Sequence, residues 1–260
     1  MISVREVHKS FGGIAAVRGC SLDLPAGAIT GLIGPNGAGK TTLFSIIAGF
    51  MRPTSGQVLL DDEVVTGLPP HRLFNRGLIR TFQIPHVFER MTVLENLMVV
   101  PAGQRGENIF TSWFGWARVR RQDSEIRDRA DDVLEFLNLT GVRDHLAGQL
   151  SGGQKKLLEL GRTMMSGCKT VLLDEPGAGV NRTLLARLVE DIERLNKERG
   201  YTFCVIEHDM DVIARLCDPV IVMNEGHVLT EGSFDEVRRN DQVLEAYLGG
   251  RTTDEEPAQA

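Results

Sequence analysis

The sequence has few cysteines, and they are widely spaced. The four thiols, at Cys20, Cys168, Cys204 and Cys217, include no C-x-x-C pair of the kind found at redox and zinc sites. A chain of 260 residues can bury a sizeable core without disulfides. Residues 1–9 also lack the apolar segment of a secretory signal. We therefore expect one large domain in a reducing, cytoplasmic compartment.

The sequence also lacks long apolar runs and an excess of basic residues. No apolar run approaches the roughly 18 to 20 residues that a transmembrane helix needs. The 29 Lys and Arg residues against 35 Asp and Glu residues give a net charge of −6. A mildly acidic chain is a poor candidate for an extensive nucleic-acid-binding surface, which would be basic. We expect no nucleic-acid partner, and any role at a membrane must depend on partner subunits.

The pattern of apolar residues predicts an α/β fold with a mostly parallel sheet. Residues 28–33 form a short apolar run typical of a buried strand, which enters a glycine-rich loop followed by a helix over 41–48. Residues 56–65 indicate a hairpin that turns at an acidic stretch. From residue 170 onward strands and helices alternate, which is typical of parallel strands covered by helices. The predicted elements of that region are a strand at 170–174, a helix at 183–199, a strand at 202–206, a helix at 209–216 and a strand at 219–223.

Between these regions the periodicity becomes helical, which predicts an inserted subdomain. We expect a single unit over 1–250, whose core with its antiparallel β subdomain covers 1–90 and 166–235. The helical subdomain covers about 91–165, a C-terminal helix covers 236–250, and the polar tail at 251–260 is expected to be disordered. Trp113 and Trp116 lie in a polar stretch of the insertion. They anchor either the core or a loop of that subdomain, or they contact a membrane partner or the bilayer interface.

The glycine-rich loop carries the first motif with a chemical meaning. The sequence fits G-x-x-x-x-G-K-[ST] over Gly34, Pro35, Asn36, Gly37, Ala38, Gly39, Lys40 and Thr41. Glycines allow successive backbone N–H groups to curl around phosphate oxygens, and the following helix adds its positive end. Lys40 is expected to reach the β- and γ-phosphates and Thr41 to ligate Mg²⁺, with Thr42 also at the nucleotide. The strand–loop–helix context predicts a nucleoside triphosphate site.

Two acids and a serine-led turn extend this site. Asp174 and Glu175 end an apolar strand, where a carboxylate suits Mg²⁺ coordination and a second one suits a general base for the attacking water. Ser151 is a good N-cap for a helix over 155–165, and a serine between glycines at a helix start can also bind an anion. Taken alone, the acids fit a solvated strand end and the serine an ordinary cap. Pairing with the phosphate loop favours the functional interpretation of the two acids, whereas the residues alone leave the serine as a cap.

These motifs together resemble the nucleotide-binding subunits of ABC transporters, over residues 2 to about 248. Gly34–Thr41 resembles the family's Walker A motif and Val171–Glu175 its Walker B motif. The signature motif is matched at Leu150, Ser151, Gly152, Gly153 and Gln154. The resemblance implies that Gln83 contacts Mg²⁺ and the γ-phosphate side, that His208 is the switch histidine, and that Phe11 stacks on adenine. It also implies a dimer in which the Ser151 loop of one subunit closes over ATP held by the Lys40 loop of the other.

Several segments narrow the resemblance to the branched-chain amino-acid uptake ATPases of bacteria. These are residues 79–83, 88–99, 207–210 and 245–248, together with an insertion of about 25 residues after residue 100. The resemblance implies an ATP hydrolase on the cytoplasmic face of the inner membrane. Its implied partners are two membrane permease subunits, a second ATPase subunit (a paralogue or a second copy) and, indirectly, a periplasmic binding protein. The signature is complete here, although it often is not in this subfamily.

Three alternatives stay open at this point. Urea- or amide-uptake ATPases and lipopolysaccharide-export ATPases share much of the same pattern. A soluble ABC protein acting on ribosomes or DNA is a third reading, but such proteins usually carry two cassettes or a long coiled coil. The sequence also departs from the ABC family pattern at the D-loop, where Asn181 stands in place of the usual acid.

Overall fold

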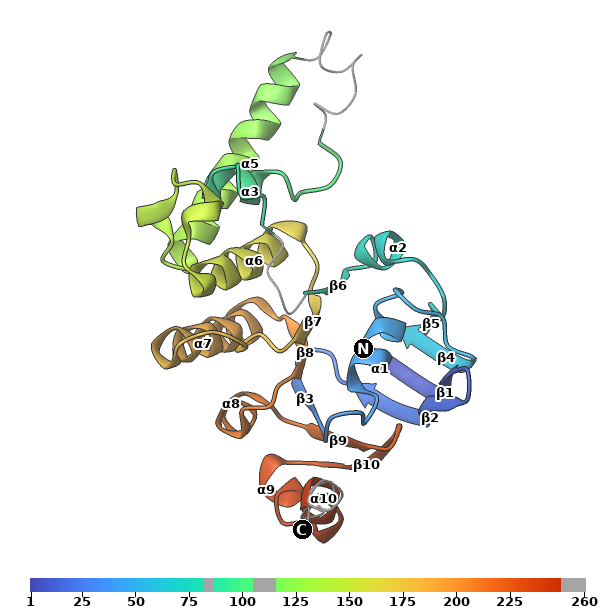
Figure 1. Cartoon of the computed structure of the whole chain (residues 1–260). Coiled ribbons are helices and arrows are strands. Elements are labelled where there is room, and N and C mark those ends of the chain that lie inside the picture. Colours follow the sequence, from blue (N-terminus) through green and yellow to red (C-terminus); the bar gives the residue numbers. More distant parts are fainter. Residues whose placement is uncertain (82–86, 105–115, 249–260) are drawn as a thin grey trace, which may run out of the picture. The chain divides into compact units, whose positions relative to one another are not determined.

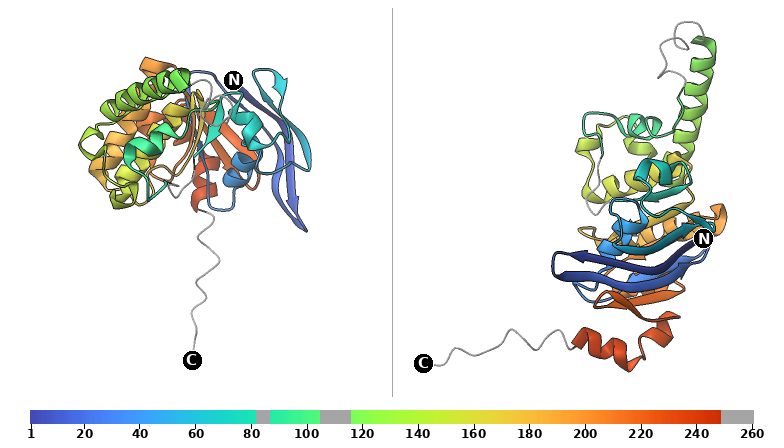
Figure 2. Two further views of the ribbon diagram at one scale, coloured as in Figure 1. Left: turned by 90° about the horizontal axis from the view of Figure 1, so that it is seen from above. Right: turned by 90° about the vertical axis from the view of Figure 1, so that its right-hand side faces the viewer.

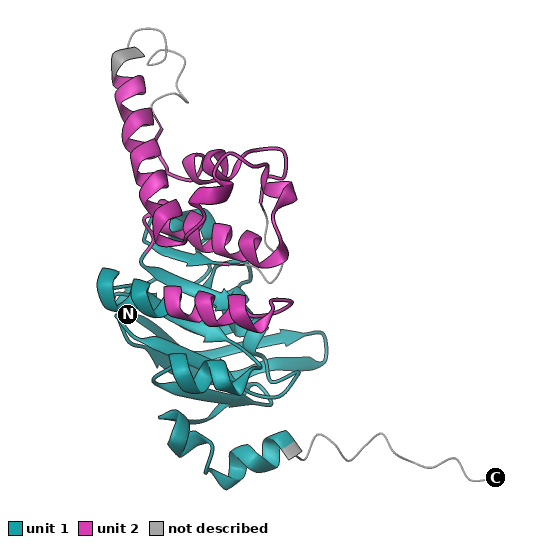
Figure 3. Ribbon diagram, turned by 90° about the vertical axis from the view of Figure 1, so that its left-hand side faces the viewer, with its two compact units in different colours: residues 1–80, 169–176, 192–260 teal, residues 81–168, 177–191 magenta. Residues whose placement is uncertain are grey.

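The computed structural model describes residues 1–81, 87–104 and 116–248. The chain divides into two compact units, which Figure 3 shows in two colours. Unit 1 is built from Met1–Arg80, Lys169–Pro176 and Ile192–Ala260, and unit 2 from Thr81–Cys168 and Gly177–Asp191. Each unit thus brings together segments that are far apart in the sequence.

A six-stranded sheet forms the centre of unit 1 (Figure 1). In sheet order its strands are β10 (His227–Gly232), β9 (Val220–Asn224), β3 (Ile29–Ile33), β8 (Thr202–Ile206), β7 (Thr170–Asp174) and β6 (Leu78–Arg80). Neighbouring strands from β9 to β6 are parallel, and only the pairing of β10 with β9 is antiparallel. Every residue of β3 and β8 is buried, as expected for strands covered on both faces. The predicted parallel α/β fold is confirmed.

A second, antiparallel sheet of unit 1 has the order β2-β1-β4-β5. Its strands are β1 (Ile2–Phe11), β2 (Ile14–Leu24), β4 (Ser55–Leu60) and β5 (Glu63–Val64). The first two form the long hairpin visible in Figure 2. The predicted second hairpin turns at Asp61 and Asp62, both with positive φ. Short polar side chains tolerate that left-handed conformation better than most, which is why the turn falls there.

Helix α1 (Lys40–Ile47) shares one apolar core with the two sheets of unit 1. Its Leu43, Phe44 and Ile47 are almost fully buried and belong to the same cluster as Val4 of β1 and Leu32 of β3. Burying such side chains contributes about 1.5–3 kcal/mol each. The loop that precedes α1 is thereby anchored at both ends, by β3 and by a helix that cannot shift without exposing the core.

The remaining helices of unit 1 are short. They are α2 (Pro70–Phe74), α8 (Met210–Leu216), α9 (Phe234–Val237) and α10 (Asp241–Leu248). Asp209 caps α8 by accepting hydrogen bonds from the backbone N–H groups of Asp211 and Val212, and Ser233 forms a capping box with Glu236 at α9. The C-terminal helix expected over 236–250 is therefore divided into two. Strands β6 and β10 and helix α2 were not anticipated from the sequence.

The described regular elements of unit 2 are helices. They are α3 (Val93–Met98), α5 (Trp116–Phe136), the 3₁₀ turns η2 (Thr140–Val142) and η3 (Ala147–Gln149), and α6 (Gly152–Ser166), and α7 (Arg182–Arg199) begins in this unit. Helices α3, α5 and α6 contact one another through buried aliphatic side chains such as Leu97, Leu134 and Leu157. The helical periodicity of the sequence predicted this region correctly.

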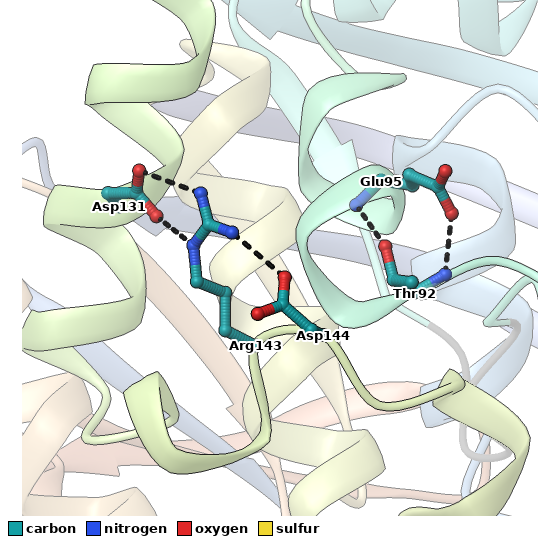
Figure 4. A network of polar contacts seen from close by, with 5 residues as sticks. All are labelled: Thr92, Glu95, Asp131, Arg143 and Asp144. Carbon is teal, nitrogen blue, oxygen red and sulfur yellow. Dashed lines mark hydrogen bonds and ion pairs between the residues drawn. The ribbon is translucent and has the colours of Figure 1, made fainter.

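Polar contacts fix the connections of unit 2 (Figure 4). Thr92 caps α3 and forms a capping box with Glu95. The Arg143 guanidinium donates to both carboxylate oxygens of Asp131 on α5 (2.7 and 3.1 Å) and also to Asp144. These hydrogen bonds from Arg143 lower the pKa of Asp131. The connection after α5 is therefore tied back to that helix by charged groups as well as by apolar packing.

Some expectations fall on residues outside the described ranges. Gln83, Trp113 and the tail at 251–260 lie there, and Trp116 is the first residue of α5. Within the described ranges, no helix combines the length and apolar character that crossing a membrane requires.

Candidate functional site

The loop between β3 and α1 has a backbone that only glycine can adopt at its two ends. Gly34 has φ +147°, and a Cβ there would lie 2.1 Å from the carbonyl oxygen of Met223. Gly39, the N-cap of α1, has φ +96°, and a Cβ there would lie 2.4 Å from the carbonyl oxygen of Ala16. Both positions therefore exclude a side chain on steric grounds. The close approach of the neighbouring backbones holds the loop in a tight curl.

Lys40 lies inside this curl. Its Nζ donates hydrogen bonds to the carbonyl oxygens of Gly34 (2.6 Å) and Pro35 (3.0 Å), and the residue is 6% exposed. Burial lowers the pKa of Lys40, and the negative charges of Glu175 and Asp174 oppose that effect. A buried ammonium held by neutral carbonyl oxygens would gain a much stronger partner in an anionic phosphate.

An open cavity of about 380 Å³ adjoins the loop and belongs to unit 1. Its described lining consists of Phe11, Ala16, Asn36, Gly37, Ala38, Gly39, Lys40, Thr41, Thr42, Glu175 and His208. The N-terminus of α1, an eight-residue helix, opens into the same space, so its free N–H groups favour an anion there. The structure thus brings together the predicted phosphate loop, the predicted base, the predicted switch histidine and the predicted adenine platform.

Two acids follow one another at the end of β7. Asp174 is the last strand residue and is 8% exposed, and Glu175 follows with φ +50°, an unfavourable conformation for a non-glycine residue. Such strain costs on the order of 1–3 kcal/mol and is typical of functional sites. The Glu175 backbone N–H donates to the carbonyl oxygen of Ile206 (2.9 Å) on the neighbouring strand β8. This bond helps to hold the strained residue in place.

His208 follows strand β8 at the same edge of the sheet. Its Nε2 lies 2.9 Å from Oε1 of Glu175. The contact arises because β7 and β8 are parallel neighbours, with Asp174 opposite Ile206, so both chains leave the sheet side by side. The histidine is half exposed and the glutamate a quarter exposed, which leaves the pair accessible from the cavity.

Phe11 forms one wall of the cavity. It ends strand β1, is 47% exposed, and has the Lys9 ammonium 5.2 Å from the centre of its ring. An exposed aromatic face is energetically unfavourable in water unless it is covered, and it is suited to stacking on a planar base.

Thr41 and Asp174 offer oxygen ligands for a cation. A hydroxyl and a carboxylate are hard donors of the kind that Mg²⁺ prefers, and Mg²⁺ retains several waters when it binds alongside phosphates. Among the described residues there is no cluster of three or more His, Cys, Asp and Glu side chains that could hold a metal alone. The donor set therefore fits Mg²⁺ bound together with a phosphate ligand, and Gln83, the third predicted ligand, lies outside the described residues.

The sequence predicted no role for Arg80, the last residue of β6. Its Nη2 lies 2.6 Å from Oδ2 of Asp174, and its Nη1 donates to Oγ of Ser45 (2.8 Å). An arginine three positions before Gln83 was the available signal, but its pairing depends on strand β6, which was not anticipated. Ala16, which also lines the cavity, carried no sequence signal.

The predicted signature loop belongs to unit 2. Ser151 caps α6 by accepting a hydrogen bond from the backbone N–H of Gln154, and the Gln154 side chain accepts from the backbone N–H of Ser151. Helix α6 begins at Gly152, earlier than the position predicted for it, so Gly152 and Gly153 form its first turn. Asn181, the departure at the D-loop, accepts a hydrogen bond from the backbone N–H of Leu184 (3.0 Å) and so serves as a cap for α7.

The sequence matches two family models. The model of the ABC transporter family matches residues 17–178. A second model, of the branched-chain amino acid ATP-binding cassette transporter, matches residues 227–252, which include β10, α9 and α10.

Curated relatives match over almost the whole chain. A probable branched-chain amino acid transport ATP-binding protein LivG from Archaeoglobus fulgidus is 40% identical, with 98% of this chain and 97% of the relative covered. The high-affinity branched-chain amino acid transport ATP-binding protein BraF of Pseudomonas aeruginosa is 38% identical, with 96% and 98% covered.

Solved structures match the fold. An ATP-binding cassette of an ABC transporter in its ADP conformation is 34% identical with a TM-score of 0.81, and the match covers 96% of this chain and 98% of that one. A dimeric cassette in a post-hydrolysis state, bound to ADP and Pi, is 25% identical with a TM-score of 0.72, covering 90% and 99%.

Proposed function

The chain belongs to the ABC transporter family, and from that premise we propose that it binds and hydrolyses ATP to power uptake of branched-chain amino acids through a membrane permease. The observation that carries the proposal is the cavity in which Lys40, Glu175 and His208 meet at the N-terminus of α1. It combines an anion-binding loop with a carboxylate held beside it. Relatives named for branched-chain amino acid transport, matched over nearly their whole length, support the choice of substrate.

The groups at the cavity account for nucleotide binding. The backbone N–H groups of the loop and the Lys40 ammonium hold the β- and γ-phosphates, and Phe11 stacks on the adenine. Thr41 and Asp174 would hold Mg²⁺, with Gln83 as the remaining protein ligand. Bound there, Mg²⁺ neutralises charge on the phosphates.

Hydrolysis uses the pair at the edge of the sheet. Glu175 accepts a hydrogen bond from the water that attacks the γ-phosphate and takes its proton. His208 lies at hydrogen-bond distance from that carboxylate and so keeps it oriented toward the cavity. Phosphoryl transfer demands mainly positioning and charge stabilisation, and this set of groups supplies both.

A complete site requires a second cassette. ABC cassettes dimerise, as the solved dimeric relative illustrates. We place the Ser151 loop, with Gly152, Gly153 and Gln154, over ATP held by the Lys40 loop of the other subunit, where the N-terminus of α6 faces the γ-phosphate. Hydrolysis then occurs only in the closed dimer, which couples it to a conformational change.

The remaining partners follow from the transport function. Two transmembrane permease subunits bind the pair of cassettes, of which the second is a paralogue or another copy of this chain. A periplasmic binding protein delivers the amino acid from outside. The chain itself acts peripherally on the cytoplasmic face of the inner membrane.

Isolation of the complex tests this function. The affinity-tagged full chain is purified from membranes of its own cells, its partners are identified by mass spectrometry, and ATP turnover is measured with candidate substrates and the co-purifying binding protein. We expect permease subunits, and stimulation by leucine, isoleucine or valine. Stimulation by urea or an amide instead, or recovery of the chain without any membrane subunit, would contradict the proposal.

A further inference from the structure

Arg80 connects the two elements that carry the expected metal ligands. It lies at the end of β6, next to β7 in the sheet, with Arg80 opposite Leu172. We propose that Arg80 is a positioning residue that fixes the carboxylate of Asp174 relative to Thr41, and so sets the affinity of the site for the metal–nucleotide complex. This inference rests on the proposed function, because it concerns the metal that accompanies ATP.

A continuous chain of hydrogen bonds supports this role. Arg80 Nη2 lies 2.6 Å from Oδ2 of Asp174, and Nη1 donates to Oγ of Ser45 (2.8 Å). Ser45 in turn donates to the backbone carbonyl oxygen of Thr41 (2.7 Å), one turn earlier in α1. The end of β7 and the first turn of α1 are thus joined through one guanidinium. All of these residues belong to unit 1.

Burial makes the contact specific. The side chains of Arg80 and Asp174 are 8% and 10% exposed. A buried charge that loses its partner is strongly unfavourable, so the two side chains constrain each other. The planar guanidinium can donate to two acceptors in fixed directions, whereas the ammonium of a lysine is a single point of charge. A lysine has one nitrogen in place of the two that contact Asp174 and Ser45, so it cannot reproduce both contacts in the same directions.

The contact also orients the Asp174 carboxylate, because Arg80 engages its Oδ2 at 2.6 Å. Residues that orient a metal ligand in this way are worth about 10- to 100-fold in metal affinity.

The test compares nucleotide binding with and without metal in the full chain. Dissociation constants of a non-hydrolysable ATP analogue are measured by calorimetry in Mn²⁺ and in EDTA, and Mn²⁺ electron paramagnetic resonance reports on the metal's ligands. The variants are Arg80→Met and Arg80→Lys. The matched control is Arg76→Met, which removes an exposed arginine that pairs with Glu63 at 3.5 Å.

In both Arg80 variants we expect the affinity for the ATP analogue to be preserved in EDTA and to fall by about 10- to 100-fold in Mn²⁺. The electron paramagnetic resonance spectrum of bound Mn²⁺ should also change. The control should match the wild type in every measurement. Equal or tighter binding of the nucleotide in Mn²⁺ for Arg80→Met would overturn the proposal. That result is expected if Arg80 contributes only its charge, because removing a positive charge near the site should favour the cation. Full rescue by Arg80→Lys would also overturn it, since charge alone would then suffice.

Ser45→Ala covers the case in which Arg80→Met does not fold. It leaves the Arg80–Asp174 pair intact and removes the other end of the chain of hydrogen bonds. We expect a smaller loss of affinity in Mn²⁺ with an unchanged thermal midpoint, and an unchanged affinity would overturn the bridging role. If the wild type hydrolyses no ATP, the proposed function fails; if it does and these variants bind like the wild type, only this inference fails.

Discussion

Nε2 of His208 lies 2.9 Å from Oε1 of Glu175, and both residues line the cavity beside the phosphate-binding loop. An ionised carboxylate can only accept hydrogen bonds, so the imidazole must carry a proton on Nε2 to make this contact. The pair fixes the direction of the carboxylate that we propose as the base.

The first prediction concerns Glu175→Gln. The amide keeps the size of the side chain and can still contact His208, but it cannot take a proton from water. We expect ATP turnover to fall by about 100-fold or more, with nucleotide affinity retained and the closed dimer prolonged. Turnover assays and analytical ultracentrifugation with ATP measure both effects. Glu63→Gln, on an exposed strand, is the control, and wild-type turnover in Glu175→Gln would remove Glu175 from the role of base.

The second prediction concerns Lys40→Ala. The variant removes a buried ammonium that lies within the loop and is proposed to contact the phosphates. We expect nucleotide affinity itself to be lost, in metal and in EDTA alike, which distinguishes this variant from the Arg80 variants. Equilibrium binding of a fluorescent ATP analogue provides the measurement. Binding at wild-type strength would contradict the assignment of the phosphate loop.

The third prediction concerns Phe11→Ala. Because the ring is half exposed at the wall of the cavity, its removal should weaken ATP binding by about 1–3 kcal/mol, the range for base–aromatic stacking. Val64→Ala removes another exposed apolar side chain away from the cavity and should have no effect. Unchanged ATP affinity in Phe11→Ala would show that the ring does not contact the base.

The fourth prediction concerns the thiols. All four cysteines are buried, none forms a disulfide in the described part of the chain, and burial raises the pKa of each thiol, to about 12 for Cys20 and Cys217. A thiol must ionise to react, so at pH 8 the native chain should resist iodoacetamide, whereas the denatured chain should be labelled four times. Mass spectrometry counts the labels. Rapid labelling of the native chain would contradict the described burial.

Much of the fold was predictable because its signals are local. The apolar run that becomes β3, the glycine-rich loop and the helical pattern after it are contiguous, and each depends on nearest neighbours in the chain. The same holds for Ser151, whose capping role requires only the residues that follow it. Strand β6, by contrast, has three residues, too few to show a period.

The contacts within the site were not predictable from local pattern. Arg80 and Asp174 are 94 positions apart and meet only because β6 and β7 are parallel neighbours. Likewise, Glu175 was assigned from its place after an apolar strand and His208 by resemblance, but their direct contact depends on the register of β7 with β8. Motifs identify the residues, whereas the strand order of the sheet determines which of them touch.

The most direct test of the account measures transport itself. The complex isolated through the tagged chain is placed in proteoliposomes with Mg-ATP on the side of this chain, and uptake of radiolabelled leucine is followed together with ATP turnover. We predict uptake that requires ATP and that stops when the chain carries Glu175→Gln. Leucine uptake at the wild-type rate in the Glu175→Gln complex, or turnover with no leucine uptake by the wild type, would contradict the central claim.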